Sequence, residues 1–129
     1  MKVCTNCGIS KETYNFAKDT SKKDNLYNKC KECQSKLFTQ YTRTKLGLIK
    51  KMYRSQVKNS ILRGHLPPEY SLDELIEELL SSKLFNRLYT EWVQSNYKRH
   101  LIPSIDRISD TAGYTRKNVQ LMTWENNNT

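Results

Sequence analysis

Two Cys-x-x-Cys pairs constrain the fold of this chain more than any other feature of its sequence. The cysteines are Cys4, Cys7, Cys30 and Cys33, with 22 residues between the pairs and no further cysteine among the 129 residues. The two-residue loops turn both sulfurs of a pair toward one point, so that four thiolates can reach one zinc ion tetrahedrally. The spacing therefore predicts a structural zinc module in residues 1–40.

Two other uses of paired cysteines remain open at this point. Disulfides are disfavoured in a reducing cytoplasm, and a redox Cys-x-x-Cys needs no matching second pair. We expect a cytoplasmic protein without a membrane partner, because the N-terminal MKVCTNCGIS lacks the apolar stretch of a signal peptide. No segment reaches the roughly 20 apolar residues of a membrane span. A four-cysteine site has no open coordination position, so its zinc would be structural and not catalytic.

Positive charge is concentrated in the first half of the chain. The formal net charge is +9, with 15 Lys and Arg against 4 Asp and Glu in residues 1–63 but 7 against 9 in residues 64–129. Such an excess points to a polyanionic partner. We expect this partner to be nucleic acid, with double-stranded DNA as the first candidate, bound through the N-terminal half.

Residues 31–64 have helical periodicity, with a break expected near Gly47. Apolar side chains recur three or four residues apart on one face; they are Leu46, Ile49, Tyr53, Val57 and Ile61. Basic side chains occupy other positions and are Lys50, Lys51, Arg54, Lys58 and Arg63. For any single one of them, a solvated helix face is the alternative. As a group with almost no acidic neighbours they are expected to contact phosphates, since an anionic partner relieves their repulsion.

The prolines of GHLPPEY mark a boundary between a basic helical segment, residues 41–66, and a C-terminal part, residues 67–129. A helix is expected to begin after Ser71, which can form a capping box with Glu74. A second helix is expected in SKLFNRLYTEWVQSN. The predicted core positions are Leu72, Leu75, Ile76, Leu79 and Leu80 in the first helix, and Leu84, Phe85, Leu88, Trp92 and Val93 in the second.

The pattern changes to strands after Pro103. SIDRI and NVQLM alternate apolar and polar side chains, and SDTAGYTRK between them has the composition of a loop, with Gly113 expected at a positive-φ turn. TWENNN is expected to begin a helix capped by Thr123. Strand, loop, strand and helix form a ββα unit that is too small to be stable alone. We expect it to pack on the two apolar helices that precede it.

The stretch PSIDRISDTAGYTRKNVQLMTW resembles the ββα-metal motif of HNH (His-Me finger) endonucleases, in a form common among phage and mobile-element proteins. The leading VCTNCG and NKCKECQ resemble the zinc knuckles that often precede this motif. The resemblance implies an α+β protein with a treble-clef or ribbon-like zinc module, a helical middle and a C-terminal ββα-metal site. It also implies that the protein acts in the cytoplasm of a host cell if a phage encodes it.

The resemblance assigns a catalytic Mg2+ or Mn2+ to oxygen ligands in the last quarter of the chain. Asp106 takes the place of the ligand at the end of the first strand, Asn118 that of the residue that helps to hold loop and metal, and Asn127 that of the ligand in the helix. Asn126 and Asn128 replace Asn127 if the helix register differs. Without the resemblance, Asp106 reads as a partner for Arg107 or Arg116, and Asn118 as a cap that satisfies backbone groups of the loop.

Arg107 stands where the family has its general base, a histidine. A guanidinium does not accept a proton from water at neutral pH, so Arg107 is expected to hold the scissile phosphate or stabilise transition-state charge. Deprotonation of the attacking water would then depend on a metal ion that lowers the pKa of this water, or on another side chain. His100, the nearest imidazole in sequence, is the candidate, and His65 is a weaker one.

The sequence thus predicts a metal-dependent DNA endonuclease or nickase. The basic half would bind the phosphate backbone, and the C-terminal site would hydrolyse a phosphodiester. The alternative is a catalytically inactive zinc-finger adaptor that binds DNA or a host protein, which is favoured by the missing histidine and the few residues after Trp124.

Overall fold

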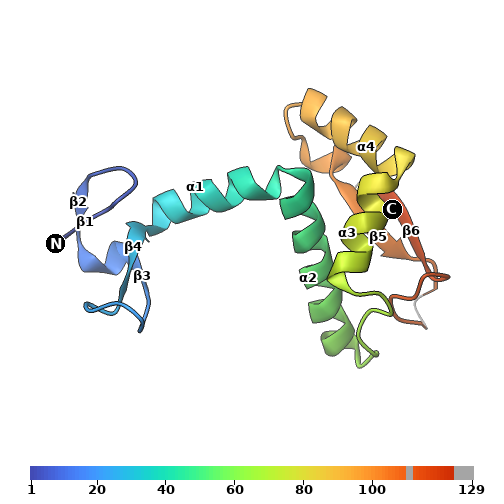
Figure 1. Ribbon diagram of the computed structural model, residues 1–129, viewed down its shortest axis with the longest axis horizontal. Helices are drawn as coiled ribbons and strands as arrows, with labels where there is room; N and C mark the ends of the chain where they lie inside the picture. Colours follow the sequence, from blue (N-terminus) through green and yellow to red (C-terminus); the bar gives the residue numbers. More distant parts are fainter. Residues whose placement is uncertain (110–111, 124–129) are drawn as a thin grey trace. The chain divides into compact units, whose positions relative to one another are not determined.

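The computed structural model describes residues 1–109 and 112–123. The chain divides into two compact units, Met1–Tyr41 and Thr42–Thr129, and each is considered by itself. The described residues contain four α-helices, two short 3-10 helices and three two-stranded sheets (Figure 1). This mixture of helices and small sheets confirms the expected α+β class.

The first unit consists of two small hairpins followed by a helix. Strand β1 (Lys2–Val3) pairs with β2 (Ser10–Lys11), and β3 (Phe16–Lys18) pairs with β4 (Leu26–Cys30). A 3-10 helix, η1 (Thr13–Asn15), precedes β3, and α1 (Lys31–Thr42) follows β4 directly. The buried side chains of this unit are Cys4, Phe16, Cys30 and Cys33, with Leu26 packed against them. A core this small, in which three of the four buried residues are cysteines, depends on a further cross-link.

The second unit packs three helices with one hairpin. Its elements are α2 (Lys45–Arg63), α3 (Leu72–Ser81), α4 (Lys83–Gln94), η2 (Arg99–Leu101), β5 (Pro103–Arg107) and β6 (Val119–Thr123). Figure 1 shows α2 running alongside α3, while α4 contacts both strands of the hairpin. A single hydrophobic cluster joins all of them; its buried members are Leu48, Ile49, Tyr70, Leu75, Leu79, Phe85, Trp92 and Tyr114. This packing places α2 within the C-terminal unit and not in a separate segment of residues 41–66.

The first long helical segment is broken earlier than the sequence suggested. Helix α1 ends at Thr42 and α2 begins after Thr44, whose hydroxyl accepts a hydrogen bond from the Gly47 amide at 3.0 Å. Thr44 thus caps α2, and Gly47 lies buried in its first turn. The other end of α2 is closed by Gly64 in the left-handed region, at φ 70°. The predicted break is therefore present, but it lies three residues before Gly47 because the Thr44 cap, and not the glycine, decides where α2 starts.

Helix α2 buries a different face from the one expected. Ile49 is fully buried and Tyr53 packs against the cluster, but Leu46 and Ile61 are exposed. The buried positions also include Leu48 and two polar residues, Gln56 and Ser60. The apolar spacing was misleading because this helix packs against the core mainly through its first half.

The two following helices form largely as expected. Ser71 and Glu74 form a complete capping box at the start of α3, as the sequence predicted, and Ser82 caps α4 through the Phe85 amide at 3.1 Å. The buried core positions are Leu75 and Leu79 in α3, and Phe85, Leu88 and Trp92 in α4. Leu80 and Leu84 are partly exposed, because each lies at the edge of its helix's buried stripe.

The predicted C-terminal hairpin is present. β5 and β6 are antiparallel, with Ile105 opposite Leu121 and Asp106 opposite Gln120. The helix expected from Thr123 to Asn128 lies outside the described residues apart from Thr123, which ends β6. Gly113 does not have the expected positive φ. A Cβ atom at Gly113 would lie 3.4 Å from Cβ of His65, an ordinary van der Waals distance.

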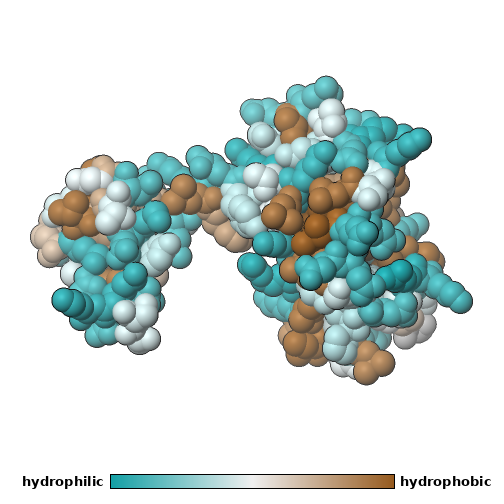
Figure 2. All heavy atoms as spheres, viewed as in Figure 1, coloured by the Kyte–Doolittle hydropathy of each residue, from teal (hydrophilic) through white to brown (hydrophobic). Residues whose placement is uncertain are grey.

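Hydrophobic side chains also reach the surface. Ile61, Leu62 and Leu66 are exposed around the C-terminal end of α2, and Figure 2 shows hydrophobic residues gathered over that end. Among the described residues, no helix has both the length and the apolar character needed to cross a membrane.

Phe85 is completely buried at the centre of the second unit's cluster. Phe85→Ala is expected to lower the free energy of unfolding by about 3–5 kcal/mol, because it removes a large apolar side chain and leaves a cavity. Urea denaturation followed by tryptophan fluorescence measures this loss. Leu80→Ala, at a partly exposed position of α3, is the control and should cost much less. Equal losses for the two variants would contradict the placement of the core.

Candidate functional site

The four cysteines converge in the first unit. The Sγ atoms of Cys4, Cys7, Cys30 and Cys33 all lie within 4.8 Å of one another. Zn–S bonds of about 2.3 Å in a tetrahedron separate the sulfurs by roughly 3.8 Å, so the arrangement is close to that of a bound site. The first pair comes from the turn after β1, and the second spans the junction of β4 and α1. The four thiols can therefore hold one metal ion.

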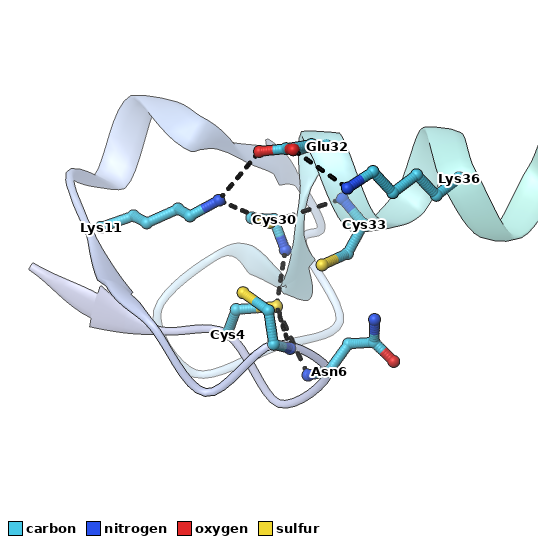
Figure 3. Close-up of polar contacts among 8 residues, drawn as sticks. Cys4, Asn6, Lys11, Cys30, Glu32, Cys33 and Lys36 are labelled. Carbon is cyan, nitrogen blue, oxygen red and sulfur yellow. Dashed lines mark hydrogen bonds and ion pairs between the residues drawn. The ribbon is translucent and has the colours of Figure 1, made fainter.

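Backbone amides stabilise thiolates in this cluster. The N–H groups of Asn6, Cys7 and Cys30 donate to Cys4 Sγ at 3.4, 3.5 and 3.3 Å. Burial raises the pKa of the Cys4 thiol, but the amides outweigh burial and lower it from 9.0 to about 6. The pKa of Cys30 is also lowered, chiefly by the amide of Cys33, 3.5 Å away. Figure 3 shows these contacts converging on the sulfurs.

Repulsion among the sulfurs opposes ionisation of all four thiols when no cation is bound. The side chain of Asn6 lowers the pKa of Cys33, but the neighbouring sulfurs and burial outweigh it and raise this pKa from 9.0 to about 11. A divalent ion removes that obstacle, because metal binding displaces the remaining thiol protons. An all-sulfur, tetrahedral donor set is the one typical of structural zinc.

Lys11 is a charged neighbour of the cluster that the sequence did not single out. Its Nζ lies 3.2 Å from Cys30 Sγ and 3.4 Å from Glu32 Oε2 (Figure 3). Contact with Cys30 raises the pKa of Lys11, so the ammonium group stays charged and offsets negative charge on the sulfurs. Pairing of β1 with β2 carries Lys11 to this position, and no local sequence pattern indicates it.

Metal removal is expected to unfold the first unit, since cysteines make up most of its core. Elemental analysis should find one zinc per chain, and chelation should collapse the amide NMR signals of β3 and β4 while signals around Phe85 persist. Cys33→Ser should lose the metal, and Ser35→Ala, on the exposed part of α1, should keep it. Unchanged NMR spectra after complete removal of the metal would contradict a zinc-dependent unit.

A second site lies in the C-terminal unit, where a groove of about 610 Å³ separates α2 from β5. Four basic side chains line it, with Lys51 and Arg63 from α2, Arg99 from η2 and Arg107 from β5. Asp106 supplies an acidic side chain to the same lining. Four cations that line one groove suit an anionic ligand.

Arg107 is held at the end of β5 by residues of the following loop and by His65. Its Nη1 donates to the carbonyl of Ala112 at 3.0 Å and lies 3.4 Å from Nε2 of His65. The guanidinium also lies 5.9 Å from the ring centre of the buried Tyr114. His65, the weaker histidine candidate on sequence grounds, is thus the imidazole beside Arg107. Only folding brings it there, because it lies 42 residues before Arg107.

Asn118 holds the loop between β5 and β6. Its Nδ2 donates to the carbonyls of Ser109, Ala112 and Gly113 at 3.1, 3.2 and 2.9 Å, and its Oδ1 accepts from the Ser109 amide at 2.9 Å. The side chain is buried. These bonds are those of the loop cap that the sequence offered as an alternative to metal ligation. They fix the backbone directly after Asp106 and Arg107.

Other expected residues lie away from the groove or outside the described part of the chain. His100 is exposed on η2. Arg116 pairs with Glu74, which also forms the capping box of α3. The groove lining does not include His100, Lys50, Arg54 or Lys58. Asn126, Asn127 and Asn128 lie outside the described residues.

Comparisons of the chain with protein-family models, with curated proteins and with solved structures found no match. Its function is therefore inferred from the chemistry of the cysteine cluster and of the groove.

Asn118→Ala is expected to lower the free energy of unfolding by about 1–3 kcal/mol, because it removes the buried amide that pairs with the backbone of Ser109, Ala112 and Gly113. Chemical denaturation measures the loss, and hydrogen exchange of the Ser109 amide should accelerate. Gln120→Ala, at an exposed position two residues along, should change stability by less than about 0.5 kcal/mol. Identical behaviour of the two variants would show that the amide does not hold the loop.

Proposed function

We propose that the protein is a metal-dependent phosphodiester hydrolase that binds DNA and cuts it in the groove between α2 and β5. The observation that carries this proposal is the groove lining, in which Asp106 lies among Lys51, Arg63, Arg99 and Arg107. Hydrolysis of a phosphodiester requires a bound anion and stabilisation of charge that develops in the transition state. The lining supplies cations for both tasks and a carboxylate for a metal.

The DNA backbone is held by basic residues of α2 and of the groove. Lys51 and Arg63 belong both to the predicted phosphate-binding set and to the lining. Lys50, Arg54 and Lys58 lie on the same helix outside the groove and extend the positive field along it. This electrostatic contact does not depend on base sequence, so it gives affinity and positioning more than specificity.

Asp106 is the described residue that would hold the catalytic Mg2+ or Mn2+. Such an ion, when bound, polarises the phosphate and lowers the pKa of its water. Hard oxygen donors of this kind suit both ions. In this proposal Asn118 acts through the loop that it fixes after β5, and Asn127 remains a predicted ligand.

Arg107 is assigned to the scissile phosphate. Its guanidinium stays charged at any working pH, and it is fixed by Ala112 and His65 at the edge of the groove. A positioned cation of this type stabilises the additional negative charge of the transition state. In this proposal His65 positions Arg107, because its Nε2 faces the guanidinium and neither His65 nor His100 lines the groove; the proton of the attacking water passes to bulk water.

Nicking of supercoiled plasmid is expected with Mg2+ or Mn2+ and not in buffer without added divalent metal. EDTA is avoided as the negative control because it would also remove the structural zinc. Asp106→Ala should lower the nicking rate by about 100-fold or more, since it removes the metal's carboxylate ligand. Asp73→Ala, the same change at an exposed position in the first turn of α3, should retain the rate within about twofold.

Two results would count against the proposal. If Asp106→Ala nicks plasmid as fast as the wild type, the catalytic site does not include Asp106. If the folded wild-type protein does not nick DNA, it is not a nuclease and can at most bind DNA. Binding in Ca2+ separates these cases, because affinity for the basic groove should fall steeply as salt rises. An affinity that does not depend on salt would indicate a protein partner in place of DNA.

A further inference from the structure

Gln56 is a buried polar residue in the α2 wall of the groove. Its side chain is 3% exposed and lines the groove together with Lys51 and Arg63 of the same helix. Its amide Nε2 is fully buried and makes no hydrogen bond to any residue in the ranges 1–109 and 112–123. Burying an unpaired amide donor destabilises a folded chain. The unpaired Nε2 of Gln56 therefore points to a ligand in the groove that supplies a hydrogen-bond acceptor.

A hydrogen bond from Tyr70 fixes the orientation of the Gln56 amide. Its Oε1 accepts a hydrogen bond from the hydroxyl of Tyr70 at 2.7 Å. Burial raises the pKa of Tyr70 well above its usual range, so the phenol remains a donor. The hydroxyl of Tyr53 donates to the carbonyl of Tyr70 at 3.2 Å, which fixes Tyr70 in turn. With Oε1 accepting from Tyr70, the unpaired group of the Gln56 side chain is its Nε2 donor.

The basic side chains of the groove have the same donor character. Lys51, Arg63 and Arg99 carry hydrogen-bond donors and no acceptors in their charged groups, and all three line the groove. The complement of these cations and of an amide donor is an oxygen-rich anion. We propose that Nε2 of Gln56 donates a hydrogen bond to a phosphate oxygen of the DNA strand that lies in this groove. This inference rests on the proposed function and adds a neutral ligand for the substrate phosphate.

A matched pair of variants tests this contact. Gln56→Glu keeps an acceptor for Tyr70 but replaces the donor with a carboxylate, whereas Gln94→Glu makes the same change at an exposed position at the end of α4. Fluorescence anisotropy with a labelled 20-base-pair duplex is measured in Ca2+, so that cleavage does not interfere. Gln56→Glu is expected to weaken binding about tenfold or more, and Gln94→Glu less than about twofold. Equal affinities of the two variants would overturn the inference and leave the proposed function standing.

A measurement on the wild-type protein tests the same contact even if Gln56→Glu does not fold. The side-chain amide signals of Gln56 in an ¹H–¹⁵N spectrum should shift when DNA is added, and the Gln94 signals should not. An abasic sugar–phosphate oligonucleotide should cause the same shift if the acceptor is a phosphate oxygen. A shift that requires bases would overturn the phosphate assignment, and DNA binding without any shift would overturn the contact. Absence of DNA binding by the wild-type protein would instead contradict the proposed function and, with it, this contact.

Discussion

The hydrophobic cluster that joins α2, α3 and α4 to the β5–β6 hairpin is the packing on which the candidate site depends. Ile49 at the start of α2 and Phe85 in α4 are both fully buried in it, and Ile105 of β5 packs against it. Because protein interiors are closely packed, these contacts fix the position of α2 against β5. The groove with Asp106 and Arg107 lies between elements that this one cluster holds in place.

The two units are both small, and they are stabilised in different ways. The second unit buries enough aromatic and aliphatic side chains to form its own cluster, whereas the first buries three cysteines, Phe16 and little else. A bound metal replaces the missing apolar core in such a segment. The amides around Cys4 and the ammonium of Lys11 favour thiolates at this site.

The sequence predicted those features that depend on neighbours along the chain. The Ser71–Glu74 capping box, the α3 and α4 helices and the β5–β6 hairpin all follow from patterns within a few residues, and the structure confirms them. The differences arise where a cap or a packing partner decides. The exact position of the break near Gly47 and the buried face of α2 were inferred from local spacing, but the Thr44 cap and the core packing decided them. The positive φ expected for Gly113 was wrong.

Sequence alone determined the cysteine cluster, because two short loops turn paired thiols toward one point whatever surrounds them. It also singled out Asp106 and Arg107, which the structure places in the lining of one groove. Only the tertiary structure decided what surrounds this pair: His65 beside Arg107, Asn118 occupied with the loop, and Gln56 in the opposite wall of the groove. His65 and Arg107 are 42 positions apart, and the burial of a shared hydrophobic core, not local spacing, brings α2 and β5 together.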